Sequence, residues 1–230
     1  MGNPFIRSPW RRGVVTALGA VAVAASALAL ASTATAAAQF GSRYLDTSCC
    51  TLYGGRANID SVNLNPSTAL AAARVEADNA GAYLVQSGFI RTQNIGWANC
   101  PDVSTRHRFY EALTPSGTYC NSYSDATLTR AAVLRLSTGP TNWGAYLDGV
   151  KVFDGPVGFS TASGYLAGDE MNGTGGPMTA RFGAGDTPWQ RALNIDASSY
   201  YTIQGSFVFR APSDKWSIGS LPSPFTISGP

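Results

Sequence analysis

The segment from Trp143 to Phe153 restricts the fold of this chain more than any other feature. It reads Trp-Gly-Ala-Tyr-Leu, then Asp148-Gly149, then Val-Lys-Val-Phe. Asp-Gly tolerates the positive φ angles that a two-residue hairpin turn requires. The residues on either side include the aromatic and β-branched types that strands prefer. The pattern therefore predicts two antiparallel strands joined by a tight turn.

Other short segments with strand character are separated by Gly, Asn, Asp and Pro. They cover 54–64, 69–77, 82–91, 106–113, 127–136, 164–171, 178–183 and 201–209. The alanine-rich stretch 69–77 also has helical character, but its short length and flanking turn residues favour a strand. The proline-rich C-terminal tail is expected to run over the surface. Since no long helix is predicted, we expect an all-β, antiparallel two-sheet β-sandwich or jelly roll.

The first forty residues have a composition unlike the rest of the chain. Three arginines (Arg7, Arg11 and Arg12) precede an apolar run over 14–30, and small residues then offer cleavage after Ala36 or Ala38. This order is typical of a secretory signal peptide, whereas a permanent membrane anchor would have a stop-transfer pattern. We therefore predict a signal peptide over 1–36, an irregular segment over 37–53, a sandwich domain over 54–230, and an extracellular location. The arginine pair leaves both general and twin-arginine export open.

Signal removal changes the charge of the protein. The chain has a net charge of +2, and loss of the three leader arginines leaves −1. The remaining basic residues are scattered, which argues against a nucleic-acid partner. The chain has no second long apolar run, so we expect no membrane association after the signal peptide is cleaved. In the absence of a heptad pattern or another oligomerisation element, we expect a monomer.

Four cysteines follow the predicted signal peptide: Cys49, Cys50, Cys100 and Cys120. In an oxidising compartment they are expected to form two disulfides. A bond between neighbours would close a strained ring, so at least one of the first two should make a long-range link. Cys100 to Cys120 is the simplest local closure. The chain has no Cys-x-x-Cys and a single histidine, His107, so no metal site is predicted, and no cofactor fingerprint is present.

Glutamate is rare, and Glu76, Glu111 and Glu170 are its only occurrences. A Ser-His-Asp triad is disfavoured because His107 would be its only base and no Gly-x-Ser-x-Gly elbow exists. Glu170 stands in an otherwise small and apolar strand, where a partly desolvated carboxyl can act as an acid or base. The alternatives are a carboxylate that faces solvent or one that binds calcium together with Asn172.

The segment Leu-Val-Gln-Ser-Gly-Phe around Gln86 resembles the Gln-Thr-Gly strand of the glutamic peptidases (eqolisins) and the Ile-Gln-x-Gly-Trp strand of neprosin-like proteins. The Trp143 hairpin, followed by a Gly-rich strand with Glu170, is similar to the neprosin-type order. The resemblance implies an exported, concanavalin-like sandwich that acts on polypeptides in acid. It implies Glu170 as general base and then acid, with the Gln86 amide stabilising the oxyanion.

The sequence is also compatible with two other functions, one of which is not enzymatic. One is a non-catalytic module that binds glycans or cell-wall polymer through exposed aromatic residues. The candidates are Trp97, Tyr110, Tyr123, Trp143 and Trp189. The other is a glycosidase that uses Glu111 and Glu170, whose carboxyls would then lie about 5–10 Å apart.

Overall fold

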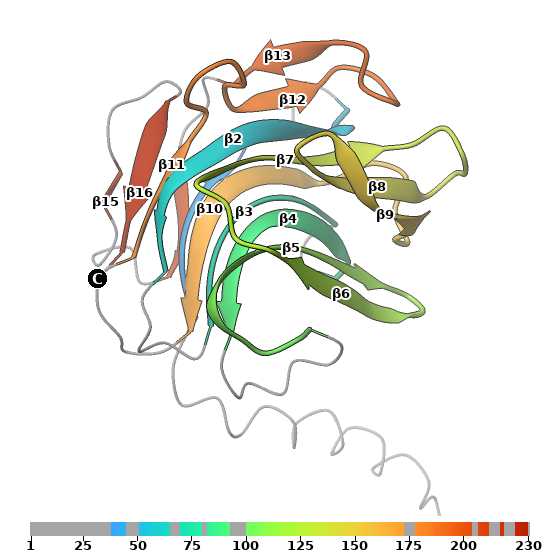
Figure 1. Cartoon of the computed structure of the whole chain (residues 1–230). Coiled ribbons are helices and arrows are strands. Elements are labelled where there is room, and N and C mark those ends of the chain that lie inside the picture. Colours follow the sequence, from blue (N-terminus) through green and yellow to red (C-terminus); the bar gives the residue numbers. More distant parts are fainter. Residues whose placement is uncertain are drawn as a thin grey trace, which may run out of the picture. The chain divides into compact units, whose positions relative to one another are not determined.

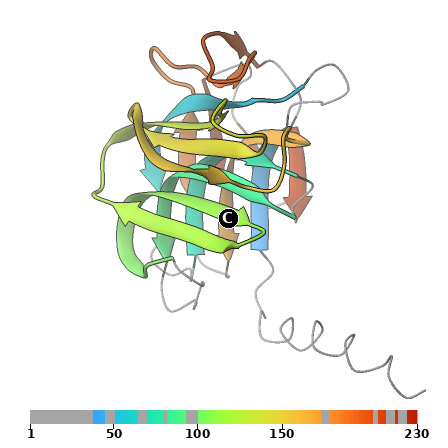
Figure 2. The same cartoon turned by 90° about the vertical axis from the view of Figure 1, so that its right-hand side faces the viewer.

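The strands of this chain pair into two antiparallel sheets that lie face to face as curved layers (Figures 1 and 2). The computed structural model describes residues 38–44, 51–64, 70–79, 82–92, 100–172, 178–203, 207–211, 217–218 and 224–229. Within these residues there is no helix, and therefore none long and apolar enough to cross a membrane. The predicted all-β, two-sheet sandwich is confirmed.

The first sheet has seven strands in the order β14-β1-β10-β3-β4-β5-β6. Their bounds are β14 Phe207–Ala211, β1 Ala38–Tyr44, β10 Gly164–Asn172, β3 Leu70–Asp78, β4 Leu84–Thr92, β5 Val103–Thr114 and β6 Gly117–Tyr123. Because each pair is antiparallel, residues directly opposite one another point to the same face of the sheet. The register therefore decides which side chains meet.

The second sheet has the path β15-β16-β11-β2-β7-β8-β9, and β12 joins it on β2 with β13 beside it. The bounds are β15 Ser217–Ile218, β16 Phe225–Ser228, β11 Thr179–Phe182, β2 Gly54–Asn63, β7 Leu128–Arg135, β8 Asn142–Leu147, β9 Val150–Pro156, β12 Gln190–Ala192 and β13 Tyr200–Thr202. The hairpin prediction is confirmed between β8 and β9. Asp148 and Gly149 form its turn with φ values of 54° and 83°.

The alanine-rich stretch forms the central strand β3, which pairs with β10 on one side and β4 on the other. All nine of its residues are buried. Small side chains suit this position because both faces of the strand are covered. Burial on both faces, which removes the usual alternation, explains why the sequence of this strand also has helical character.

Two expectations about the chain ends are wrong. The segment 37–53, expected to be irregular, contains β1, which pairs with β10 and β14. The C-terminal tail contains β16, where Phe225 and Ile227 are buried in the core. In both cases the partner strand is distant in sequence, so local pattern alone does not reveal the pairing.

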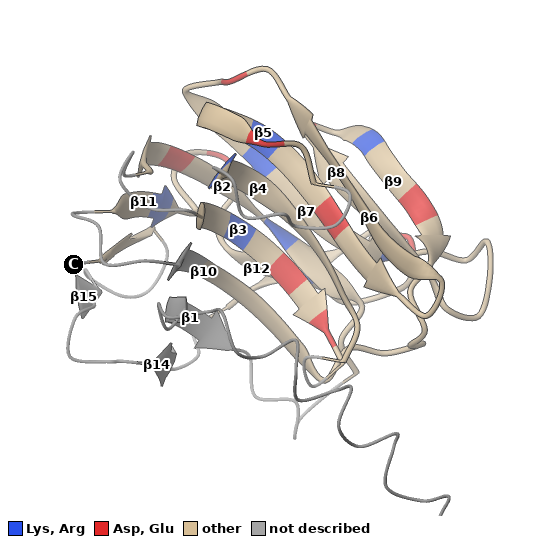
Figure 3. Cartoon of the chain, turned by 90° about the horizontal axis from the view of Figure 1, so that it is seen from below, with Lys and Arg blue, Asp and Glu red and all other residues tan. Residues whose placement is uncertain are grey.

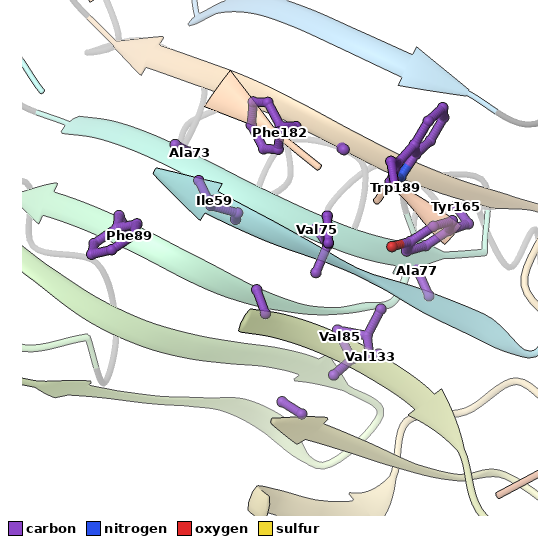
Figure 4. Packing of buried hydrophobic residues seen from close by; sticks show 14 of the residues in the cluster. Ile59, Ala73, Val75, Ala77, Val85, Phe89, Val133, Tyr165, Phe182 and Trp189 are labelled. Carbon is purple, nitrogen blue, oxygen red and sulfur yellow. The ribbon is translucent and has the colours of Figure 1, made fainter. Parts of the chain in front are cut away.

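The main core lies between the two sheets (Figure 4). The seven-stranded sheet contributes Val75, Val85, Phe89 and Tyr165, among others, and the other sheet contributes Ile59, Val133 and Phe182. Aromatic rings stack within this core, for example Phe182 on Phe225 with centroids 5.3 Å apart. The burial of these rings supplies much of the driving force that holds the two sheets together.

The predicted disulfide between Cys100 and Cys120 is present, with the two Cα atoms 4.8 Å apart. Cys120 lies on β6, the edge strand of the seven-stranded sheet, and the bond ties this edge to the residue that precedes β5. Because Cys100 and Cys120 bond to each other, the chain has no further cysteine for the long-range link expected of Cys49 or Cys50, so that expectation is wrong. Cys49 and Cys50 themselves lie outside the described residues.

Replacing both Cys100 and Cys120 with serine should lower the free energy of unfolding by about 3 kcal/mol, because the bond closes a loop of about 20 residues in the unfolded chain. Urea unfolding of the oxidised protein and the double variant measures this difference. A wild-type sample treated with reductant serves as a further comparison and should lose at least as much, because reductant breaks every disulfide of the chain. Equal unfolding midpoints in all three samples would contradict a stabilising role for this bond.

Candidate functional site

The seven-stranded sheet has an apolar inner face and a partly polar outer face. On β3, Ala73, Val75 and Ala77 belong to the core between the sheets, whereas Arg74 and Glu76 alternate with them and point to the outer face. Figure 3 looks at the molecule from the side of this sheet, and charged positions of both signs follow one another along β3. Burying a charge on a central strand costs free energy unless the charge is paired, so the charged residues make this face a candidate for a functional site.

One row of directly opposite residues crosses five strands of this sheet: Leu166, Glu76, Gln86, Glu111 and Cys120. These residues lie on β10, β3, β4, β5 and β6 in that order. We name the three central residues, Glu76, Gln86 and Glu111, the polar row. An amide with a carboxylate on each side is therefore built into the middle of the sheet.

A hydrogen bond and an ion pair are among the side-chain contacts that hold the polar row. The Nε2 atom of Gln86 donates a hydrogen bond to Oε2 of Glu111. The Nε atom of Arg74 forms a buried ion pair with Oε2 of Glu76 at 3.0 Å. Glu76 and Gln86 are 2% and 3% exposed, and Glu111 is 8% exposed. Glu111 therefore has the largest exposed fraction of the three.

The amide of Gln86 is satisfied on one side only. Its Oε1 atom is buried and has no hydrogen-bond partner among the described residues. A buried polar atom without a partner costs about 1–3 kcal/mol. Such an atom is a common feature of sites that bind a ligand or a water molecule.

The neighbours of Gln86 hold it toward the outer face. Ser87 points the other way, and its Oγ donates to the carbonyl of Ala132 on β7 at 3.1 Å, which ties β4 to the opposite sheet. Gly88 has a φ of 157°, and a Cβ atom there would lie 2.2 Å from the carbonyl oxygen of Ala73. The Gln-Ser-Gly sequence thus combines an outward amide, an inward hydroxyl and a position that only glycine can fill.

The other end of the outer face is apolar. A second hydrophobic cluster there consists of Leu70, Ala72, Ile90, Val103 and Phe109, with Cys120 packed against it. The outer face therefore carries an apolar cluster beside the polar row, and Cys120, which packs against the cluster, lies opposite Glu111 of the polar row. A substrate that contacted both ends would meet an apolar surface next to an amide and two carboxylates.

The register also gives the backbone position of Glu170, the second residue of the predicted pair. Glu170 lies opposite Ala72, which lies opposite Ile90, so its position is on the same face as Gln86. However, β3 lies between the two strands, and Glu170 comes four residues after Leu166, the β10 residue in the row of Gln86. Four residues are about 13 Å along a strand, and two strand spacings are about 10 Å across the sheet.

The glycosidase hypothesis requires two carboxyls about 5–10 Å apart. Glu111 lies on β5 and Glu170 on β10, three strands away in the order of the sheet. The same shift of four residues separates their rows. The strand register therefore does not bring this pair to the required separation.

The aromatic candidates for glycan binding divide into three groups. Trp143 and Trp189 are fully buried in the core, so they are unable to stack on a sugar. Tyr110 and Tyr123 are half-buried, and their ring centroids lie 6.5 Å apart. The pKa of Tyr110 is raised, mainly by burial of its hydroxyl and to a smaller extent by the neighbouring Tyr123. Trp97 lies outside the described residues. Two of the five candidates are thus structural, since large aromatic rings contribute strongly to burial energy.

Two surface hollows occur on the other sheet, with volumes of about 410 and 420 Å³. In the first, Arg130 pairs with Asp186 at 2.8 Å and Asp148 with Arg108 at 2.6 Å. In the second, which Arg106 of β5 also lines, Asp60 pairs with Arg181 at 2.5 Å and Arg106 with Asp125 at 2.7 Å. Hydrogen bonds, first of all from the Asn58 side chain, lower the pKa of Asp186. Across the described ranges, no group of three or more His, Cys, Asp and Glu residues could hold a metal ion. The polar row remains the better candidate for chemistry.

Sequence reasoning identified Gln86 but missed its contacts with Glu111 and the position of Glu76 beside it. One useful indication was available. Glu76 and Gln86 lie ten residues apart around a turn, so a hairpin with a symmetric register would place them opposite each other. The pairing of Gln86 with Glu111 depends on the β4–β5 register, which includes an irregularity near Ile90 and is not readable from the sequence.

Comparison of the sequence with protein families gives no match, and comparison with curated proteins gives none either. Among solved structures, the chain is similar to a crystal structure of scytalido-glutamic peptidase with a transition state analog inhibitor. The similarity covers 85% of this chain and 99% of that chain, with 15% identity and a TM-score of 0.43. At this level the comparison assigns neither a residue nor an activity to this protein.

Proposed function

We propose that this chain is an exported, acid-acting peptidase of the glutamic type, with its reactive centre at Gln86. The observation that carries the proposal is the buried amide–carboxylate contact between Gln86 and Glu111 on the outer face of the seven-stranded sheet. Amide hydrolysis needs a group that accepts and returns a proton and a donor that stabilises the tetrahedral oxyanion. A glutamate and a glutamine side chain can fill these two roles without a metal ion.

The burial of the polar row favours this function over a purely adhesive one. A glycan-binding surface gains affinity from exposed rings, yet Trp143 and Trp189 lie in the core. A reactive centre gains from desolvation, since electrostatic interactions strengthen when water is excluded.

The direct experiment is to incubate the mature protein with a denatured protein substrate between pH 2 and 7. We expect cleavage in the acidic range, as the resemblance of the Gln86 strand to the glutamic peptidases implies. Circular dichroism across the same pH range is the control for folding. A folded protein that cleaves no substrate at any acidic pH would contradict the proposal.

A further inference from the structure

We propose that Glu111 is the acid–base group that works with Gln86, a role that the resemblance to glutamic peptidases implies for Glu170. The inference rests on the proposed peptidase function and names the residue that performs proton transfer in it. The first supporting observation is a direct side-chain contact. Among the described residues, Glu111 is the carboxylate that hydrogen bonds to the Gln86 side chain.

Position along the sheet supports Glu111. Glu111 is directly opposite Gln86 on the adjacent strand β5, and directly opposite residues in an antiparallel pair have Cβ atoms about 5 Å apart. Glu170 is two strands away and lies in a different row. On β10, the position in the row of Gln86 is occupied by Leu166, whose side chain has no group that transfers protons. Proton transfer requires reach of about 3 Å, directly or through one water molecule, which favours the adjacent residue.

The other glutamate beside Gln86 is engaged elsewhere. Glu76 forms a buried ion pair with Arg74, and both side chains are at most 4% exposed. We infer that Glu76 and Arg74 hold the polar row in place, while Glu111, which contacts the Gln86 amide, accepts and returns the proton.

The hydrogen bond between Gln86 and Glu111 also orients the amide. One N–H of Nε2 is directed at the Glu111 carboxylate, and the second N–H of the same atom is then available for an oxyanion. The Oε1 atom, which has no partner among the described residues, can accept from a water molecule held beside the carboxylate. Water, base and oxyanion donor would then meet around one pair of side chains.

In the proposed reaction, Glu111 carries one proton from the water molecule to the amide nitrogen. Glu111 takes a proton from the water molecule as the water oxygen bonds to the carbonyl carbon of the peptide, and the resulting oxyanion accepts a hydrogen bond from Gln86 Nε2. The protonated Glu111 then gives the proton to the amide nitrogen, and the carbon–nitrogen bond breaks. The products are a carboxylic acid and an amine, and Glu111 returns to its initial state.

Glu111→Gln and Glu170→Gln form a matched pair of variants, since each replaces one glutamate with its amide isostere on a strand of the same sheet. The measurement is kcat/KM for a peptide substrate at the acidic optimum of the wild-type protein. We expect Glu111→Gln to lose about 10²–10⁴-fold, the usual contribution of a positioned acid–base group. Glu170→Gln should stay within about threefold of the wild type, which is below 1 kcal/mol in the transition-state free energy.

The outcomes separate this inference from the proposed function. If Glu170→Gln loses activity and Glu111→Gln retains it, the protein is a peptidase but the assignment to Glu111 is wrong. Loss in both folded variants would also overturn the assignment to Glu111 alone. No cleavage by the wild type would contradict the peptidase function itself. If Glu111→Gln does not fold, Glu111→Asp keeps a carboxyl and should retain measurable activity with an altered pH profile, whereas an unchanged rate and profile would overturn the inference.

Discussion

Gln86→Ala should lower kcat/KM for peptide cleavage in acid by about 10²–10³-fold, which is the loss expected when one oxyanion donor is removed. The physical reason is that its amide is the donor beside the Glu111 carboxylate on the outer face of the sheet. Assays of the purified variant at the acidic optimum of the wild type give the number. The effect should appear mainly in kcat, since the donor acts on charge that develops only in the transition state.

Ser87→Ala is the matched control for this prediction. Ser87 is the next residue on β4 but faces the opposite side, where its hydroxyl bonds to Ala132. Its loss should cost about 1 kcal/mol of unfolding free energy and leave kcat/KM unchanged. If Gln86→Ala remains folded and as active as Ser87→Ala, the amide has no role in the reaction.

Trp143→Ala should lower the free energy of unfolding by about 3–5 kcal/mol, as is typical for a large aromatic residue removed from a core. Trp143 is fully buried, its ring centroid lies 4.9 Å from that of Phe159, and its Nε1 donates to the Phe159 carbonyl at 2.9 Å. The variant therefore loses apolar burial, a ring contact and the partner of a buried carbonyl. Urea unfolding followed by circular dichroism measures the loss.

Trp143→Phe is the corresponding control, because it keeps a ring but removes the donor to the Phe159 carbonyl. It should be less destabilised than Trp143→Ala, by an amount that reflects the ring volume retained. Binding of the wild type to insoluble polysaccharide adds a second readout. A stable Trp143→Ala protein that had lost polysaccharide binding would reverse the structural role given to this residue and support a glycan-binding surface.

The all-β fold and most of its strands could be predicted from local pattern. The Asp148-Gly149 turn fixes a hairpin because its conformation is determined by two adjacent residues. β3 was harder to predict, since a strand buried on both faces loses the alternation that identifies strands. β1 and β16 were missed because each is stabilised by partners far away in the sequence.

The candidate site shows the same division between local and non-local information. Gln86 became a candidate because the short segment around it resembles a strand of the glutamic peptidases, which is local information; the structure places a glycine two residues later, where a Cβ atom would meet the carbonyl of Ala73. The carboxylate partner depends on strand order and register. A shift of four residues along β10 separates the row of Leu166 from the row of Glu170, and no local pattern in the sequence encodes that shift.

The interaction between Gln86 and Glu111 is tested most directly by a double-mutant cycle on kcat/KM with Gln86→Ala, Glu111→Gln and the combined variant. If amide and carboxyl act as one unit, the combined variant should be no slower than the slower single variant within about threefold, as for residues that act together in catalysis. Losses that multiply would mean that the two side chains contribute independently, and the account of a shared reactive centre on this sheet would be wrong.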